Sequence, residues 1–315
     1  VIPIAAALGY DTEFIGRGRL PQRPIDIYTR ELGKKGITFN YQNTMPFDIS
    51  GQLTSGKYEI EGNVSSQFIT GLLFALPLLE GDSEIILTSH LESRPYVDIT
   101  IDTMKRFGVI IDETETSYTI KGGQRYRSHS ERVEGDYSQA AFFCVANAIG
   151  SEVELGNLSP DSVQGDRRIT SITADILKDG VIGSFREDCS DIPDLVPILS
   201  VLAAYGSGES VIYNAERLRI KESDRLETTA AMLNGIGGDV TVTDDGLIIR
   251  PTDKLTGGKV DGCGDHRIVM AAAVAALGCS GDVIITGAEA VEKSYPDFFK
   301  DYTKLGGKAN VINLE

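Results

Sequence analysis

The nine residues LRIKESDRL place five charged side chains of both signs between an apolar run and the start of a predicted helix. Ser223 or Asp224 can cap that helix. Lys221 and Glu222 then lie in the preceding loop, and Arg225 lies in the first turn. A lysine beside a carboxylate can pass a proton, and a guanidinium clamps a carboxylate or phosphate. The segment predicts proton transfer next to a bound anion, although a solvated helix start with surface ion pairs explains the same residues.

A second cluster opens the segment CGDHRIVMAAAVAAL, whose predicted helix is apolar on every face and therefore buried. Asp265, His266 and Arg267 stand at its start. Backbone N–H groups at such a helix end favour anions, and Arg267 adds a fixed positive charge. A single histidine at a buried helix start is often structural, but the adjacent arginine favours a functional role. We include His266 among the candidate catalytic residues.

Three further helix starts carry polar groups. The segment NVSSQF offers the hydroxyls of Ser65 and Ser66 and the amide of Gln67, a neutral arrangement suited to phosphate. Capping alone explains one of the two serines. Lys293 in EKSYPDFF and Arg23 in PQRPID each precede a predicted helix. Taken singly, each of these two cations is explained equally well as a surface charge.

The elements that position these clusters form a repeat. A unit of strand, helix, strand, helix and hairpin recurs five times, at intervals of roughly 56 to 73 residues. Every polar cluster occupies the turn that enters a helix of its unit. Repeats arranged about a common axis would direct these helix starts toward one cleft and bring their cations together there. These cations are Arg23, Lys221, Arg225, Arg267 and Lys293. The pattern predicts a repetitive α/β fold with a site for more than one anionic group.

The composition excludes several classes of partner. The chain has 315 residues, with 30 Lys and Arg against 46 Asp and Glu, and a formal net charge of −16. This charge argues against nucleic acid or an anionic membrane as a partner. No apolar run is long enough for a membrane span. The four cysteines lie far apart in the sequence, and we interpret them as buried, reduced thiols of a cytoplasmic protein: Cys144, Cys189, Cys263 and Cys279.

Eight stretches of the chain closely resemble the 5-enolpyruvylshikimate-3-phosphate (EPSP) synthase family, in the family's order from end to end. They are RPID, GNVSSQFITGLL, SRPYVDIT, VEGDYSQAAFF, IPDLVPILS, LRIKESDRL, GDHRIVMAAA and KSYPDFF. The resemblance implies an α/β enolpyruvyl transferase fold, with two inside-out α/β barrel domains of repeated βαβαββ units. It places an incomplete first domain, on the shikimate 3-phosphate side, at residues 1–133. The phosphoenolpyruvate-side domain follows at 134–315.

The resemblance also implies roles for individual residues. Asp194 would deprotonate the 5-hydroxyl of shikimate 3-phosphate, and Lys221 with Glu222 would move the proton to and from the enol methylene carbon. The residues expected to hold shikimate 3-phosphate are Ser65, Ser66, Gln67, Ser93 and Tyr96. Those expected to hold phosphoenolpyruvate, with Lys221 nearby, are Arg23, Arg225, Arg267 and Lys293.

The implied reaction belongs to the shikimate pathway of aromatic amino-acid and chorismate biosynthesis. The 5-hydroxyl adds across the enolpyruvyl double bond to give a tetrahedral intermediate, which then loses inorganic phosphate. Cations neutralise two anions that would otherwise repel each other, and exclusion of water protects a reactive cationic centre. The resemblance implies no metal and no organic cofactor.

The chain departs from the family at its start. Val1 begins inside the apolar face of a helix, and the repeat length indicates a missing segment of roughly 90 residues. In the family that segment carries a Lys-Ser pair and arginines that contact the substrates, so we expect the chain alone to be impaired or inactive. Apolar surface exposed at Val1, Ile2, Ile4 and Ala5 would then favour self-association or a complementing N-terminal segment.

Two alternatives remain open. One is a non-catalytic fragment that folds and binds an anion but turns nothing over. The other is the sister enzyme that transfers enolpyruvate to UDP-N-acetylglucosamine. That enzyme usually carries a cysteine in the loop before the RP dipeptide, where GRGRLPQRP has none.

Overall fold

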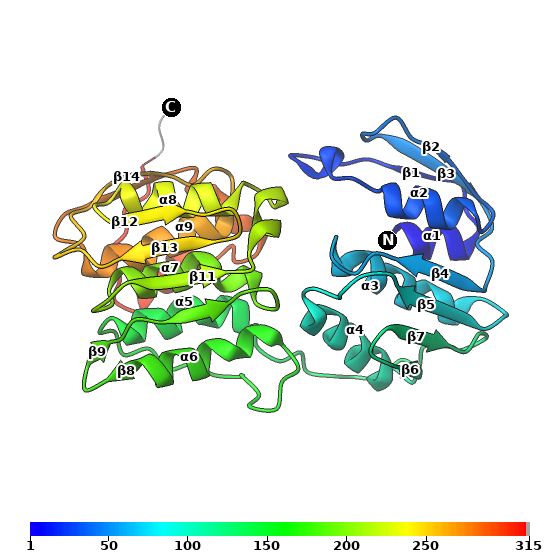
Figure 1. Cartoon of the computed structure of the whole chain (residues 1–315), viewed down its shortest axis with the longest axis horizontal. Coiled ribbons are helices and arrows are strands. Elements are labelled where there is room, and N and C mark those ends of the chain that lie inside the picture. The colour runs from blue at the N-terminus through cyan, green and yellow to red at the C-terminus, as the bar shows by residue number, and fades with distance from the viewer. Residues whose placement is uncertain (313–315) are drawn as a thin grey trace. The chain divides into compact units, whose positions relative to one another are not determined.

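The computed structural model describes residues 1–312 and divides the chain into two compact units, Val1–Val133 and Glu134–Glu315 (Figure 1). Each unit has its own apolar core, and each is described by itself below. No helix of the described part is long and apolar enough to cross a membrane.

The N-terminal unit contains two sheets and four α-helices. The helices are α1 (Ile2–Leu8), α2 (Asp26–Gly33), α3 (Ser66–Ala75) and α4 (Arg94–Arg106), with short 3₁₀ turns η1 (Leu20–Gln22) and η2 (Leu76–Leu78). One sheet has the antiparallel order β1-β3-β2, built from β1 (Thr12–Phe14), β2 (Ile37–Asn40) and β3 (Phe47–Gly51). The other has the order β4-β5-β7-β6, built from β4 (Lys57–Ile60), β5 (Ser83–Leu87), β6 (Ile111–Glu113) and β7 (Ser117–Ile120).

The C-terminal unit repeats this plan. Its helices are α5 (Tyr137–Ala148), α6 (Arg168–Ile176), α7 (Val196–Ala204), α8 (Arg225–Asn234), α9 (His266–Ala275) and α10 (Phe298–Lys304). Its main sheet, in the order β10-β11-β13-β12, consists of β10 (Arg186–Asp188), β11 (Ser210–Tyr213), β12 (Asp239–Val242) and β13 (Leu247–Arg250). Two smaller sheets pair β8 (Leu177–Lys178) with β9 (Val181–Ile182), and β14 (Gly258–Asp261) with β15 (Val283–Thr286).

The two four-stranded sheets show the repeat directly. In each, a parallel pair (β4 with β5, β10 with β11) continues into an antiparallel hairpin (β6 with β7, β12 with β13). A helix connects the parallel strands, as a parallel pairing requires. This arrangement confirms the predicted α/β repeat.

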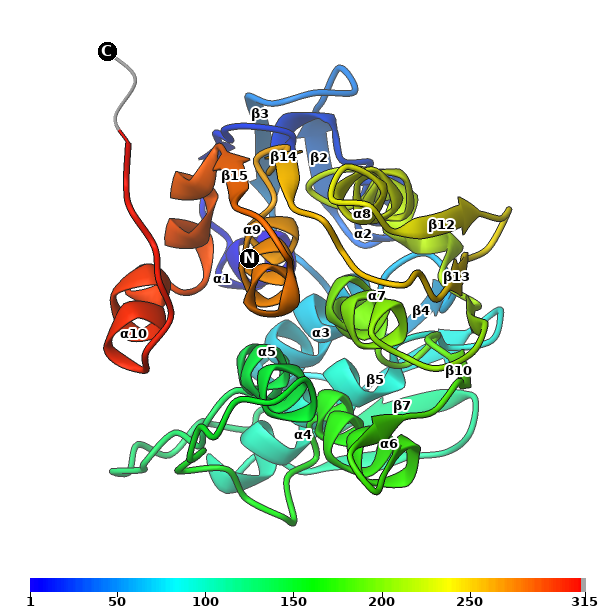
Figure 2. The ribbon, with the colours of Figure 1, turned by 90° about the vertical axis from the view of Figure 1, so that its left-hand side faces the viewer.

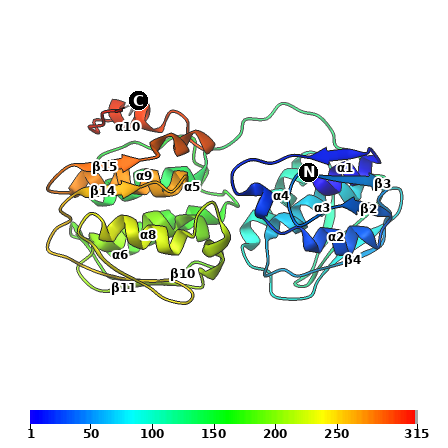
Figure 3. The same cartoon turned by 90° about the horizontal axis from the view of Figure 1, so that it is seen from above.

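Helices form the interior of the C-terminal unit. Every residue of α7 and of α9 is buried, which is the inverse of a barrel with strands inside. The helices α5, α7, α8 and α9 pack against one another, and Figure 2 shows the strands outside them. In the view of Figure 3, α9 lies alongside β14 and β15. Helices that are apolar on all faces need this central position.

Turns of 3₁₀ helix precede four of these helices and carry two of the candidate residues, Asp194 and Lys293. The turns are η3 (Gly165–Arg167), η4 (Pro193–Leu195), η5 (Glu216–Ile220) and η7 (Ala288–Lys293), whereas η6 (Ala276–Gly278) follows the end of α9. The starts of α6, α7 and α10 follow η3, η4 and η7 in the chain, and α8 follows η5.

The segment SEVELG (151–156) forms no strand, although its exposure alternates from residue to residue. Asn147 accepts a hydrogen bond from the N–H of Val153 at 2.7 Å and donates one to its C=O at 2.8 Å, so a side chain replaces the strand pairing there. Residues 308–312 also form no strand.

The exposed apolar surface at the N-terminus differs in detail from the prediction. Val1 is exposed, but Ile2 is buried because α1 packs against α3, and Ile4 and Ala5 are partly buried. The cysteines also differ from the expectation. All four are free thiols, but Cys189 is the one that is fully buried, and Cys263 is exposed.

Candidate active site

Aspartates cap three helices of the C-terminal unit. Asp136 accepts a hydrogen bond from the backbone N–H of Ser138 at 2.8 Å, Asp224 from Glu227 at 3.3 Å and Asp265 from Arg267 at 3.0 Å. A carboxylate at this position bonds an otherwise unpaired N–H and interacts favourably with the helix dipole. Of the two predicted caps of α8, the structure selects Asp224.

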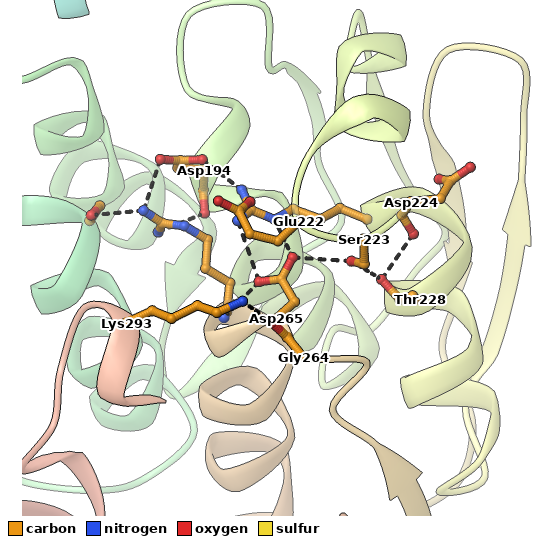
Figure 4. A network of polar contacts seen from close by, with 11 residues as sticks. Asp194, Glu222, Ser223, Asp224, Thr228, Gly264, Asp265 and Lys293 are labelled. Atoms are coloured by element: carbon orange, nitrogen blue, oxygen red, sulfur yellow. Dashed lines mark hydrogen bonds and ion pairs between the residues drawn. The ribbon is translucent and has the colours of Figure 1, made fainter. Parts of the chain in front are cut away.

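Arg225 forms the centre of a buried ion-pair network with three carboxylates that Figure 4 labels, Asp194, Glu222 and Asp265. Its Nη1 donates to Asp194 at 2.8 Å, its Nη2 to Glu222 at 2.7 Å and its Nε to Asp265 at 2.8 Å. The side chain is 2% exposed, and the three carboxylates raise the pKa of the guanidinium even though burial opposes its charge. Arg225 is therefore a fixed cation held in one orientation.

Arg267 attaches to the same network from the start of α9. Its Nη2 donates to the Asp194 carboxylate at 2.8 Å and to the Ser138 hydroxyl at 3.2 Å, and its Nη1 donates to the Asp194 carbonyl at 3.2 Å. Asp194 thus bridges two arginines that come from different helices. The structure brings Asp194, Arg225 and Arg267 together as the sequence predicted.

Lys221 and His266 border this network. Burial lowers the pKa of the Lys221 ammonium, the Asp194 carboxylate opposes that shift, and Arg225 and Arg217 add to it. Burial and then the charge of Arg267 lower the pKa of His266, which favours the neutral imidazole at pH 7. Neutral His266 and a lysine with a lowered pKa suit proton transfer.

The charges of the opening segment divide between two environments. Arg225 and Glu222 belong to the buried network, whereas Arg219 makes a half-buried ion pair with Asp224 at 3.2 Å and bonds the carbonyl of Thr243 at 2.8 Å. The charges of LRIKESDRL therefore divide between a buried network and a pair that holds the start of α8. Lys293, at the end of η7, donates to the carbonyl of Gly264 at 2.5 Å, in the loop that enters α9.

The polar groups of the N-terminal unit gather at two neighbouring helix starts. Ser65 caps α3 by accepting from the N–H of Gln67 at 3.3 Å, and Ser66 is buried in the first turn. The loops entering α3 and α4 touch, since Glu92 N–H donates to the carbonyl of Gly62 at 3.3 Å. A Cβ at Gly62 would lie 2.8 Å from the carbonyl oxygen of His90, so this contact requires glycine.

The start of α4 supplies two more predicted residues of this unit. Ser93 is fully buried at its N-cap with a left-handed backbone, φ 53°, a conformation that costs free energy in a residue other than glycine. The Tyr96 hydroxyl oxygen is buried in the first turn. Ser65, Ser66, Gln67, Ser93 and Tyr96 therefore lie on adjacent helix starts. Arg23 is on a different element, directly after η1.

The match to known proteins covers nearly the whole chain. A family model described as EPSP synthase (3-phosphoshikimate 1-carboxyvinyltransferase) matches residues 1–302. The chain belongs to the EPSP synthase family. It is 46% identical to the 3-phosphoshikimate 1-carboxyvinyltransferase of Clostridium novyi, over 98% of this chain and 74% of that protein. It is 42% identical to the one of Clostridioides difficile, over 100% of this chain and 75% of that protein.

Solved structures agree on the fold. The chain is similar to EPSP synthase from Acinetobacter baumannii, with a TM-score of 0.81, 24% identity and coverage of 98% of this chain and 77% of that one. It is also similar to the enolpyruvyl transferase NikO from Streptomyces tendae, with a TM-score of 0.75, 16% identity and coverage of 98% and 75%. The enolpyruvyl transferase fold expected from the sequence is confirmed.

In this member of the EPSP synthase family, sequence reasoning missed partners of the predicted residues. Asp265 accepts from Arg225, Arg267 and Ser223, and Ser138 accepts from Arg267. Burial by itself would raise the pKa of Asp265, but the Arg225 guanidinium holds it below its usual range. The sequence contained part of the signal for Asp265, because this residue stands directly before the candidate His266 at a predicted helix start.

Proposed function

We propose that this chain catalyses transfer of the enolpyruvyl group from phosphoenolpyruvate to the 5-hydroxyl of shikimate 3-phosphate, with release of phosphate. The observation that carries the proposal is the bridge of Asp194 between Arg225 and Arg267, both buried and fixed at helix starts. Membership of the EPSP synthase family supports it. The curated relatives carry the shikimate activity, which does not favour the UDP-N-acetylglucosamine alternative.

In this proposal Arg225, Arg267 and Lys293 hold the phosphate and carboxylate of phosphoenolpyruvate. The two arginines are neutralised by the protein's own carboxylates, Asp194 and Glu222 among them. A substrate anion must therefore displace Glu222 from Arg225, while Asp194 keeps its contacts with both arginines. Before substrate binds, these carboxylates keep the buried guanidiniums paired, because an unpaired buried charge would be costly.

Proton transfer is assigned to three groups of the network. Asp194 accepts the proton of the 5-hydroxyl as the C–O bond forms, and Lys221 delivers a proton to the methylene carbon of the enolpyruvyl group. When phosphate leaves, Glu222 removes that proton from the carbon and passes it back to Lys221. The lowered pKa of Lys221 favours donation at neutral pH, because a weaker hold on the proton makes an ammonium a better acid. Neutral His266 donates or accepts a hydrogen bond beside them.

Shikimate 3-phosphate is assigned to the N-terminal unit. Ser65, Ser66 and Gln67 offer hydroxyl, amide and backbone donors at the start of α3, and helix N-termini bind phosphate. Ser93 and Tyr96 extend this surface at the start of α4. Arg23 is assigned to phosphoenolpyruvate.

The experiment that tests the function is phosphate release from phosphoenolpyruvate, measured with and without shikimate 3-phosphate. Release that requires both substrates supports the proposal, and release without shikimate 3-phosphate contradicts it. Arg267→Gln should abolish release, whereas Arg219→Gln, a change to a half-buried arginine outside the network, should leave it within about twofold. Thermal unfolding of each variant separates loss of the site from loss of the fold.

The same assay tests whether the activity depends on a further N-terminal segment. Self-association, or complementation by an N-terminal segment, stays a prediction. The assay is repeated after adding the N-terminal quarter of the Clostridium novyi relative as a separate polypeptide. An increase in rate supports complementation, and an unchanged rate contradicts it. Sedimentation at several protein concentrations tests self-association independently.

A further inference from the structure

Asp166 is a buried carboxyl that the proposed mechanism does not use. It lies in the middle of η3, the turn that leads into α6, and it is 5% exposed. Its Oδ1 is buried and accepts no hydrogen bond from any residue between 1 and 312. Its neighbours Gly165 and Arg167 instead line a hollow of about 700 Å³ beside α5 and α6. A buried carboxyl oxygen without a donor is costly, so its retention needs an explanation.

Charged groups from several elements surround Asp166. Asp194 before α7 and Asp136 at the cap of α5 both disfavour its negative charge, whereas Arg267 and Lys221 favour it. Cys189, on the segment before η4, also interacts with it, and its own pKa is raised far above the usual value by burial. Burial, followed by the charge of Asp194, raises the pKa of Asp166 from 3.8 to about 7.

Asp194 and Asp166 form an unequal pair of carboxyls. Asp194 receives hydrogen bonds from Arg225 and Arg267 at 2.8 Å each, so its charge is matched by two guanidiniums. Asp166 makes no ion pair in the described part of the chain, although Arg267 is among its charged neighbours. When two carboxyls interact in a buried site, the pKa rises in the one that makes no ion pair.

We propose that Asp166 is a positioning residue for Asp194. Below pH 7 it carries a proton and, as the neutral member of the pair, leaves both guanidiniums to the Asp194 carboxylate. An ionised Asp166 would compete with Asp194 for Arg267 and add a second buried negative charge. The Asp194 carboxylate would then lose one of its two fixed contacts, and with it the orientation needed to accept a proton. The link to catalysis rests on the function proposed above.

The first test observes the proton directly. The protein is labelled with ¹³C at aspartate side-chain carboxyls, and their NMR signals are followed from pH 5 to pH 9. The Asp166→Asn and Asp194→Asn variants assign the two resonances. We expect one carboxyl to titrate near pH 7, its signal to be absent in Asp166→Asn, and the Asp194 signal to shift over the same pH range in the wild type alone. An Asp166 carboxyl that is fully ionised by pH 5 would overturn the proposal.

This measurement does not depend on turnover, so it separates failure of this inference from failure of the proposed function. A chain that shows the carboxyl titration but no release from both substrates contradicts the function and leaves the proton on Asp166 established. If Asp166→Asn does not fold, the wild-type titration decides alone. A group that titrates near pH 7 and moves together with a second carboxyl supports the proposal, and no such group overturns it.

The second test uses kinetics. Asparagine has the shape of aspartic acid and stays neutral, so Asp166→Asn should match the wild-type kcat within about twofold at pH 6. Above pH 7 the wild-type kcat should fall as Asp166 ionises, and the variant should lack this decline. Asp166→Ala removes the whole carboxyl group as well as its charge, so it should lower kcat at every pH. An alkaline decline of equal size in wild type and Asp166→Asn would contradict the positioning role.

Stability gives a third readout with a definite sign. The folded chain keeps a proton on Asp166 that the unfolded chain releases once the pH exceeds 3.8. Unfolding therefore becomes easier as the pH rises from about 4 to about 7, and the loss levels off above that range. Asp166→Asn removes this cost, so its Tm should exceed that of the wild type at pH 8, and the difference should vanish near pH 4. A lower Tm at pH 8 would show that the ionised carboxylate is required.

Discussion

The helices α3 and α9 both begin with backbone N–H groups that need hydrogen-bond partners, and different kinds of side chain supply these partners. In the N-terminal unit Ser65 caps α3, and the groups beside it are hydroxyls and amides without charge. In the C-terminal unit Asp265 caps α9 and is itself bound by Arg225, so each carboxylate at the start of the helix is matched by a guanidinium. Both helices occupy equivalent places in their units, between the first and second strands of the repeat.

The difference shows what an anion site requires before the anion binds. Neutral hydroxyls and backbone N–H groups need no counter-ion before a phosphate binds, because they carry no net charge. Buried arginines need counter-ions at all times, and here Asp194, Glu222 and Asp265 provide them. We infer that the N-terminal site is stabilised locally, whereas the C-terminal site is stabilised as a network.

The largest effect is expected from a substitution that breaks that network. Asp265→Ala leaves Arg225 without its fully buried partner, and removing one member of a buried pair costs about 3–5 kcal/mol. Asp224→Ala, which removes a partly exposed cap in the same unit, should cost about 1 kcal/mol. The free energy of unfolding from urea titrations measures both. Equal losses in the two variants would show that the network adds nothing beyond capping.

A second prediction concerns geometry at constant charge. Arg225→Lys keeps the positive charge but cannot maintain three directed contacts, so kcat/KM for phosphoenolpyruvate should fall about 100-fold, or about 2.7 kcal/mol. Arg219→Lys, in the same nine-residue segment but partly exposed, should remain within about twofold. Steady-state kinetics at fixed ionic strength makes the comparison. Similar losses at both positions would contradict the assignment of Arg225 to the substrate site.

A third prediction concerns the neutral site. Ser66→Ala removes one hydroxyl donor, and a hydrogen bond to a charged group contributes about 1.5–3 kcal/mol. The KM for shikimate 3-phosphate should therefore rise about tenfold or more, while the KM for phosphoenolpyruvate changes by less than about threefold. Ser89→Ala, in the neighbouring loop, serves as the control for local loosening. A change confined to phosphoenolpyruvate would reverse the assignment of the two units.

The smallest expected effect is the loss of the neutral cap. Ser65→Ala should lower the free energy of unfolding of the N-terminal unit by about 1 kcal/mol. Because no ion pair is involved, the loss should be the same at low and high salt. Denaturation at two salt concentrations checks this, with Asp224→Ala as the charged counterpart. A strong salt dependence for Ser65→Ala would show that the neutral site also depends on charge.

The sequence by itself determined the features that depend on near neighbours. Helix periods, caps such as Asp224 and the recurring strand-helix order are set by contacts within a few residues, so they can be predicted from a single chain. The predicted candidates Arg225 and Arg267 also come from local motifs, whereas Asp194 comes from the resemblance to the EPSP synthase family. The repeat itself indicated that helix starts would carry the site, and the structure brings these three together.

Only the tertiary structure decided which of these charges are buried. Arg225 and Asp265 are 40 residues apart in the chain, and Arg267 and Asp194 are 73 apart, so no local pattern pairs them. The structure also separated half-buried Arg219 from fully buried Arg225, and it buried Oδ1 of Asp166 without a hydrogen-bond donor among the described residues. Burial and charge pairing depend on every element packed around a group, and that environment exists only after the helices have come together.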